Sequence, residues 1–161
     1  MNESGYYNDE IRTEAQQLLT AGEIDKAYQI LAEPLHEALY QRQDFNLLDE
    51  LPTTQRLVLA FDYVQSQVVQ GGFIQLIQNG YISLLVTVIE ALQELQVGAD
   101  MVPVLDDVLK IFVLNKDALS KETSVEEFSK LYAEFQEFEP LEQRFMEVLN
   151  STQQAIISEA V

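Results

Sequence analysis

Residues 57–80 read LVLAFDYVQSQVVQGGFIQLIQNG and predict two consecutive helices separated by a pair of glycines. The first helix is expected from Leu57 to Val69, where apolar residues recur at helical spacing. Gly71-Gly72 should end it, because glycine adopts left-handed backbone geometry without a steric cost. A short second helix, Phe73 to Gln78, should then stop at Asn79-Gly80, a pair that is typical of turns.

Helical patterns continue on both sides of this run. Before it, a helix capped by Asn8 or Asp9 should stop at Gly22, and the next contains Pro34, which we expect to kink or divide it. The helices predicted after it are 82–97, which stops at Gly98; 100–114, capped by Asp100; one that begins at Ser124 and presents Val125, Phe128, Leu131, Tyr132, Phe135 and Phe138 on one face; and one from Leu141 to Ile156. The sequence therefore predicts an all-α fold of seven to nine helices.

The length of 161 residues is that of one domain. We expect a single globular domain over 1–161, with an N-terminal helical arm (1–46), a central part (47–115) and acidic C-terminal helices (116–161). Acids concentrate in residues 1–50, with 11 acids and 3 bases, and in residues 122–147, with 8 acids and 2 bases. The apolar middle should form the core, and these two acidic arms should form the charged surface.

The overall charge excludes several classes of function. The chain has 9 Lys and Arg against 27 Asp and Glu, for a formal net charge of −18. Direct binding to nucleic acid or to an anionic membrane surface is not expected, because both need basic side chains. The sequence has no cysteine, which excludes disulfides, thiolate zinc sites and iron–sulfur clusters. The N-terminus does not resemble a signal peptide, and no uncharged apolar run reaches the roughly 20 residues of a membrane span, so we expect a cytoplasmic protein.

Catalytic patterns are sparse. His36 is the single histidine, so a paired-imidazole metal site is excluded. Glu33 and His36 have the Glu-x-x-His spacing of di-iron bundles, but those bundles need two such motifs. We interpret the two residues as a partly exposed polar pair near a helix kink. We therefore expect no enzymatic activity, no cofactor and no bound metal.

The corner at Gly71-Gly72 allows two interpretations. In the first, which is favoured, it is only a helix end and a tight turn. In the second, it displays the side-chain amides of Gln70, Gln75, Gln78 and Asn79, which can recognise a partner or form a buried polar network.

Eight glutamates are expected to bind a partner through charge. They are Glu126, Glu127, Glu134, Glu137, Glu10, Glu14, Glu33 and Glu37. Carboxylates three or four residues apart on a helix lie about 5–6 Å apart, and each DNA strand carries a phosphate about every 3.4 Å. An acidic helical surface can therefore present negative charge to a basic protein at a density close to that of DNA. Acidity that serves only solubility is the alternative.

Three segments together resemble a known family: LPTTQR at 51–56, FDYV at 61–64 and VVQGGFIQLIQNG at 68–80. They resemble the DNA-mimic protein 19 family (domain of unknown function 4375). Its motif, Asn-Gly-Gly-Phe-x-Gln-Phe-Phe-x-Asn, is matched by Gly71, Gly72, Phe73, Gln75 and Asn79. Gln70 replaces the motif's first Asn, and Leu76-Ile77 replace its aromatic pair. The resemblance covers residues 47–115 and implies an all-α fold, a tendency to dimerise, and acidic mimicry of DNA toward a DNA-binding protein.

We therefore expect a non-catalytic acidic interaction protein that blocks a basic DNA-binding protein or nuclease. A homodimer is expected, because the apolar middle exceeds what one small core can cover. Three alternatives stay open: an immunity or antitoxin-type inhibitor of a toxin such as a basic nuclease, a metal-dependent or hydrolytic enzyme that uses His36, and a structural helical domain without mimicry.

Overall fold

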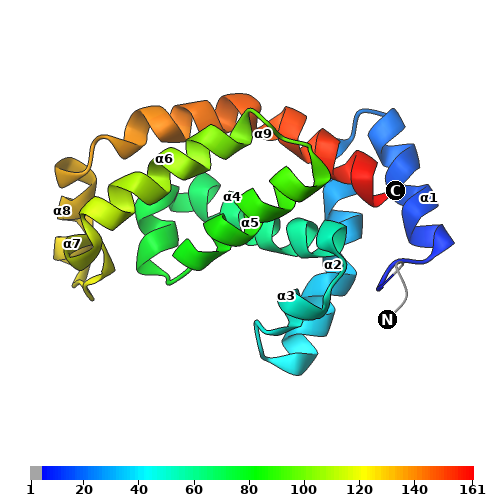
Figure 1. Cartoon of the computed structure of the whole chain (residues 1–161), viewed down its shortest axis with the longest axis horizontal. Helices are drawn as coiled ribbons and strands as arrows, with labels where there is room; N and C mark the ends of the chain where they lie inside the picture. The colour runs from blue at the N-terminus through cyan, green and yellow to red at the C-terminus, as the bar shows by residue number, and fades with distance from the viewer. Residues whose placement is uncertain (1–4) are drawn as a thin grey trace.

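The computed structural model describes residues 5–161, and this part of the chain contains nine α-helices and no strand. The helices are α1 (Asp9–Thr20), α2 (Ile24–Arg42), α3 (Leu47–Glu50), α4 (Thr53–Gln78), α5 (Ile82–Leu95), α6 (Met101–Leu114), α7 (Lys116–Ser120), α8 (Val125–Glu134) and α9 (Phe138–Ala160). Figure 1 shows them as one elongated domain. The predicted all-α fold of seven to nine helices is confirmed.

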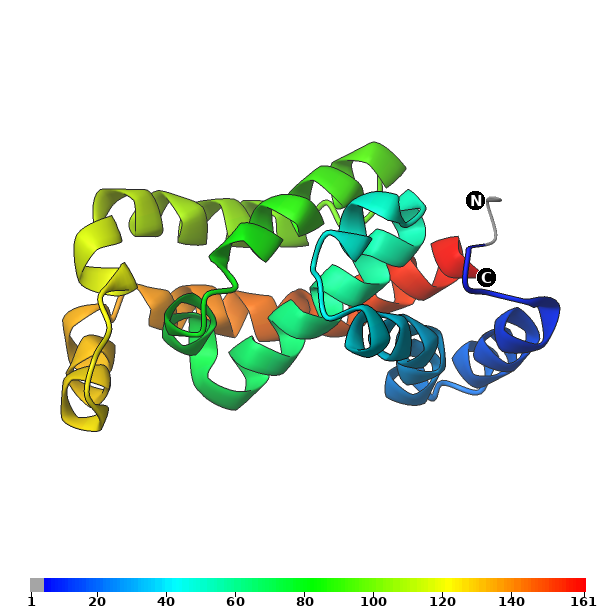
Figure 2. The same ribbon diagram turned by 90° about the horizontal axis from the view of Figure 1, so that it is seen from below.

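Four helices form the centre of the molecule. α4 packs against α5 and α9, and α6 packs against the same two helices. In Figure 2, α5 and α6 lie in one layer above α4 and α9. Buried aromatic rings join α4 to α9: the ring centroid of Phe145 lies 6.1 Å from that of Phe61 and 5.8 Å from that of Phe73. Such rings bury large apolar areas and anchor the two helices to each other.

The acidic arms form the two ends of the molecule. α1 and α2 pack against each other at one end, and Gly22, with a φ of 78°, makes the turn between them as predicted. α7 and α8 lie at the opposite end (Figure 1). Negative charge is therefore concentrated at two separated places.

The core draws on the acidic arms as well as on the apolar middle, which is more than the sequence pattern suggested. Tyr28, Leu31 and Leu35 of α2 are fully buried, as are Phe138 and Phe145 of α9. Both helices place acidic residues on the solvent side and an apolar stripe on the inner side. The same segments thus supply surface charge and core.

Pro34 does not divide α2. The helix is continuous from Ile24 to Arg42, with Pro34 inside it. Proline lacks the N–H that would bond to the carbonyl of Ile30. Leu31 and Leu35, on either side of the proline, are fully buried, and their packing holds the helix together.

The capping residues behave in two ways. Asn8 Oδ1 accepts a hydrogen bond from the N–H of Ile11, and Ser124 Oγ accepts one from the N–H of Glu127, as the sequence predicts. The side chain of Asp100, by contrast, makes no capping hydrogen bond. Its backbone is helical, with φ −77° and ψ −23°, whereas a capping residue needs extended geometry.

The predicted apolar face of α8 is shorter than expected. Val125 is 86% exposed and does not belong to the buried face. α8 ends at Glu134, so Phe138 opens α9 instead of closing α8. Among the residues of α8, Leu131 alone is buried, and this helix is therefore lightly anchored.

Among residues 5–161, no single helix is both long enough and apolar enough to cross a membrane. α4 and α5 meet that criterion only when they are taken together, and they are bent by 114° at the break between them.

Candidate functional site

Gly72 breaks α4 into the two helical pieces that the sequence predicts. Its backbone, with φ 76° and ψ −174°, is far from helical. A β-carbon at this position would overlap the carboxylate of Glu142 on α9. Glycine is required here for its backbone freedom, and a β-carbon would also have to displace the carboxylate at the end of the Glu142 side chain.

The corner at Gly71-Gly72 is held by the C-terminal helices. The N–H of Phe73 donates to Glu142 Oε1 at 3.1 Å, and the hydroxyl of Tyr132 on α8 donates to the carbonyl of Gly71 at 2.6 Å. We call these two bonds the latch. Burial raises the pKa of Glu142; the bond from Phe73 opposes that rise, and the charge of Glu139 adds to it. The latch therefore places a half-buried carboxylate at the start of the second piece of α4, where N–H groups lack helical partners.

The amide side chains around the corner form hydrogen bonds with other residues of the protein. Gln75 Nε2 and Asn79 Nδ2 both donate to Gln67 Oε1, at 3.2 and 2.7 Å. Gln78 Nε2 donates to the carbonyls of Leu119 and Lys121, and Thr123 donates to Gln78 Oε1. Phe73 is fully buried. Gln75 and Asn79 thus join the two pieces of α4 to each other, and Gly71 and Phe73 join the corner to α8 and α9, which supports the architectural interpretation of the motif.

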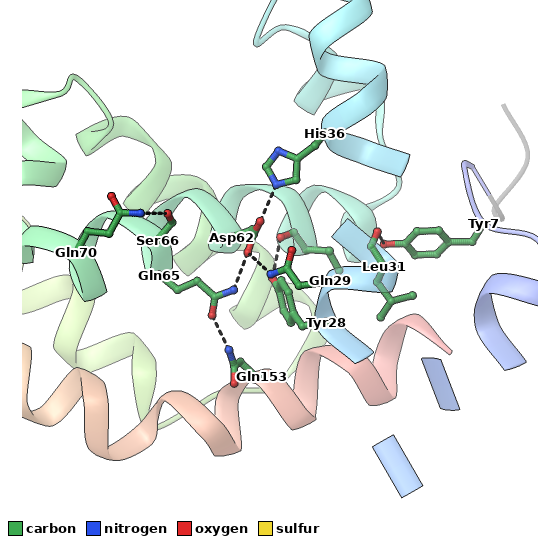
Figure 3. A network of polar contacts seen from close by, with 11 residues as sticks. Tyr7, Tyr28, Gln29, Leu31, His36, Asp62, Gln65, Ser66, Gln70 and Gln153 are labelled. Atoms are coloured by element: carbon green, nitrogen blue, oxygen red, sulfur yellow. Dashed lines mark hydrogen bonds and ion pairs between the residues drawn. The ribbon is translucent and has the colours of Figure 1, made fainter. Parts of the chain in front are cut away.

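A polar network that the sequence analysis missed links α2, α4 and α9. His36 Nε2 donates to Asp62 Oδ2 at 2.6 Å, so the partner of His36 is Asp62 and not Glu33. Gln65 Nε2 donates to Asp62 Oδ1 at 2.7 Å, and Gln153 Nε2 donates to Gln65 Oε1 at 2.7 Å. Figure 3 shows these residues converging from three helices. The network fixes one arrangement of the three helices, because each buried polar group needs its partner.

Asp62 is the electrostatic centre of this network. Burial by itself would raise the pKa of Asp62, but hydrogen bonds from His36 and Gln65 and the charge of His36 outweigh burial and lower it. Asp62 is therefore an ionised carboxylate at neutral pH, with amide and imidazole donors around it. Such a group suits the binding of a cation, and it already holds the histidine in place.

A cleft of about 560 Å³ opens beside the network. Asp25 and Gln29 of α2, Asp62 of α4, and Met146 and Gln153 of α9 are among the residues that line it. We call it the polar cleft. It lies on the surface between three helices, where ligand and partner sites are commonly found.

All eight glutamates predicted to bind a partner are exposed, but the structure does not bring them together. The first four lie at the end of the molecule that carries α8 (Glu126, Glu127, Glu134, Glu137), and the other four lie on α1 and α2 (Glu10, Glu14, Glu33, Glu37). Figure 1 shows α8 and α1 at opposite ends. Of the eight, within the described residues, Glu126 alone forms an ion pair, with Lys130 at 3.9 Å. Seven carboxylates are thus not neutralised by a neighbouring base.

A metal site requires several ligand side chains that lie close together. Within residues 5–161, no three His, Asp or Glu side chains are grouped so that they could hold a metal ion.

Comparison with known proteins gives a family for the chain. There is no significant match among the curated proteins or among the solved structures. The model of the DMP19-like protein family matches residues 49–159, which include the latch, the polar network except for His36, and the acidic C-terminal arm. Because this match spans more than half of the 161 residues, the chain belongs to the DMP19-like protein family.

Proposed function

We propose that this chain is a non-catalytic acidic interaction protein that occupies the nucleic-acid-binding surface of a basic protein. The observation that carries the proposal is the acidic C-terminal end, where Glu126, Glu127, Glu134 and Glu137 are all exposed. Membership of the DMP19-like family supports it. The excess of 27 acids over 9 bases supplies the long-range attraction to a basic partner.

The spacing of these carboxylates suits mimicry. Glu127 and Glu134 are seven residues apart on α8 and fall on the same face of that helix. Seven residues of α-helix rise about 10 Å, which is close to three phosphate steps of about 3.4 Å each. Glu137 extends the series just beyond the helix end. A protein surface that accepts phosphates three steps apart can therefore meet Glu127 and Glu134 at once.

The test is capture of the partner from a lysate of the source cell, followed by competition with duplex DNA. We expect a basic DNA-binding protein or nuclease to bind at low salt, to dissociate as salt approaches about 0.5 M, and to be displaced by DNA. Binding that DNA does not displace, or that survives high salt unchanged, contradicts mimicry. The identity of the captured protein decides between a DNA-binding protein and a toxic nuclease.

A pair of matched variants locates the site. The first changes Glu126, Glu127, Glu134 and Glu137 to Gln. The control removes four exposed charges outside the acidic arms, through Glu90→Gln, Glu94→Gln, Asp100→Asn and Glu159→Gln. We expect the first variant to bind the captured partner about tenfold more weakly or worse, and the control to bind almost as the unaltered chain does. Equal losses in both variants contradict a site at the α8 end.

A further inference from the structure

Two hollows in the surface share part of their lining and therefore adjoin each other. The polar cleft is one of them, and the second, of about 400 Å³, lies between α1 and α2. Asp25 and Gln29 line both hollows. We call the combined feature the long groove, and its main residues are Glu14, Leu18, Asp25, Gln29, Asp62 and Met146.

The floor and walls of the long groove are negatively charged. Glu14, Asp25 and Asp62 contribute three carboxylates from three helices. Lys26 is the one cationic side chain among the lining residues described, and it is paired with Glu23 at 3.0 Å. The groove therefore favours a positively charged occupant.

Exposed apolar side chains flank these charges. Val69 is 56% exposed and Met146 is 51% exposed, and both line the polar cleft. Leu18 and Ile30 line the second hollow. Alkyl chains of arginine or lysine bury their stems on such surfaces while their charged heads reach carboxylates.

Gln153 places an amide acceptor in the polar cleft. Gln153 is 6% exposed, and its Nε2 donates to Gln65 Oε1 at 2.7 Å and to Asp25 Oδ1 at 3.3 Å. Its Oε1 accepts no hydrogen bond from the residues that the structure describes, and this oxygen is open to the cleft, because no fully buried side-chain nitrogen or oxygen among these residues lacks a partner. A guanidinium or ammonium group in the cleft would supply an N–H to this oxygen and a charge to Asp25 at the same time.

We propose that the long groove binds a basic amphipathic segment of the partner, with an arginine or lysine head at Asp25 and Gln153 and apolar side chains on Val69 and Met146. This inference rests on the proposed function, because the occupant is part of the basic partner. The groove also leads to the α8 end: Gln70 lines the polar cleft and precedes Gly71, which Tyr132 of α8 contacts. One partner can therefore contact α8 and the groove together.

The test uses a short probe and the full chain labelled with ¹⁵N. Acetyl-Leu-Arg-amide is titrated into the protein, and acetyl-Leu-citrulline-amide serves as a probe of the same shape without the charge. We expect saturable shifts of the side-chain amide signals of Gln29, Gln65 and Gln153, and binding of the citrulline probe about fivefold weaker or worse. Equal binding of the two probes overturns the inference, as do shifts confined to α8.

Two variants complete the test. Asp25→Asn should weaken the arginine probe about threefold, whereas Asp100→Asn, which removes an exposed charge away from the groove, should not. An equal effect of the two variants overturns the inference. So does a change of the groove amide signals with protein concentration alone, because a second copy of the chain then occupies the groove.

Different results contradict the proposed role of the long groove and the proposed function. If the captured partner is displaced by DNA but binds the Asp25→Asn, Val69→Ser double variant as tightly as the unaltered chain, the groove is not its site and mimicry stands. If the arginine probe binds as expected but DNA does not displace the partner, mimicry fails and the groove stands as a site for basic peptides.

Discussion

At the scale of single residues, Gly72 has a backbone that only glycine adopts readily, and a β-carbon there would displace the carboxylate of Glu142. Its φ of 76° resembles that of Gly22, at 78°, but a β-carbon at Gly72 overlaps Glu142, whereas none at Gly22 meets an atom within 4 Å. We expect Gly72→Ala to lower the free energy of unfolding by about 2–4 kcal/mol and Gly22→Ala by only about 1 kcal/mol. Urea denaturation measures both. Equal losses would show that neither the contact with Glu142 nor the extended ψ of −174° at Gly72 adds to the strain of a positive φ.

Asp62 should make stability depend on pH. Its pKa in the folded protein lies below the ordinary value of 3.8. A lowered pKa means that its stabilisation is present above pH 3.8 and is lost as the pH falls through the folded-state pKa. We expect Asp62→Asn to be less stable than the unaltered chain by about 1.5–3 kcal/mol at pH 7, because a charged hydrogen-bond acceptor is removed from the network.

The gap between Asp62→Asn and the unaltered chain should narrow when unfolding is measured below pH 3.8. Asp100→Asn is the control, since Asp100 is exposed and makes no capping bond, and it should show little effect at either pH. A gap of constant size across this pH range would contradict the assignment of the charge to Asp62.

At the scale of helices, the latch ties α9 to the corner of α4 and predicts the opposite pH dependence. The pKa of Glu142 is raised above its ordinary value of 4.5, so the pH-dependent part of its contribution favours the folded state below pH 4.5 and is lost as the pH rises through the folded-state pKa, while the hydrogen bond from Phe73 remains. Glu142→Gln keeps an oxygen that can accept from the N–H of Phe73 and removes the charge. At pH 7 it should be as stable as the unaltered chain or more stable.

Glu142→Ala separates the bond from the charge. It leaves the Phe73 N–H without its side-chain acceptor, and we expect a loss of about 1–2 kcal/mol at pH 7 by thermal unfolding. If Glu142→Gln and Glu142→Ala are equally destabilised, the carboxylate acts through its charge and the latch has been misinterpreted.

The boundaries of the helices could be predicted from capping residues and glycines close by in the sequence, but the contacts between helices could not. Asn8, Gly22, Ser124 and the glycine corner each fixed a helix boundary within a few residues along the chain. The bond from Phe73 to Glu142 spans 69 residues and that from Gln153 to Gln65 spans 88. Helical periodicity gives the inward face of a helix but not the register in which two helices meet. One signal was present: Gln65 and Gln153 interrupt apolar faces, as buried polar residues with partners do.

At the scale of the whole molecule, exposure of the eight glutamates could be predicted, because charged side chains on or beside amphipathic helices stay in solvent. Their separation into two ends could not, because it depends on how α1 and α8 are placed by the four central helices (Figure 1). The long groove follows from the same placement, since its residues come from α1, α2, α4 and α9. The homodimer and the cytoplasmic location expected from the sequence stay predictions.

A net charge of −18 on one small domain predicts a conflict between binding and stability. Like charges repel most strongly in the compact state, and salt screens them. The variant with Gln at positions 126, 127, 134 and 137 should therefore melt about 2–4 °C above the unaltered chain in low salt, and the difference should shrink near 0.5 M salt. Thermal scans at the two salt concentrations measure it. The same variant should bind the basic partner more weakly, so these carboxylates lower stability in favour of recognition. If the melting temperature of this variant does not rise in low salt, repulsion among the carboxylates at the α8 end is too weak to lower the stability of the folded state.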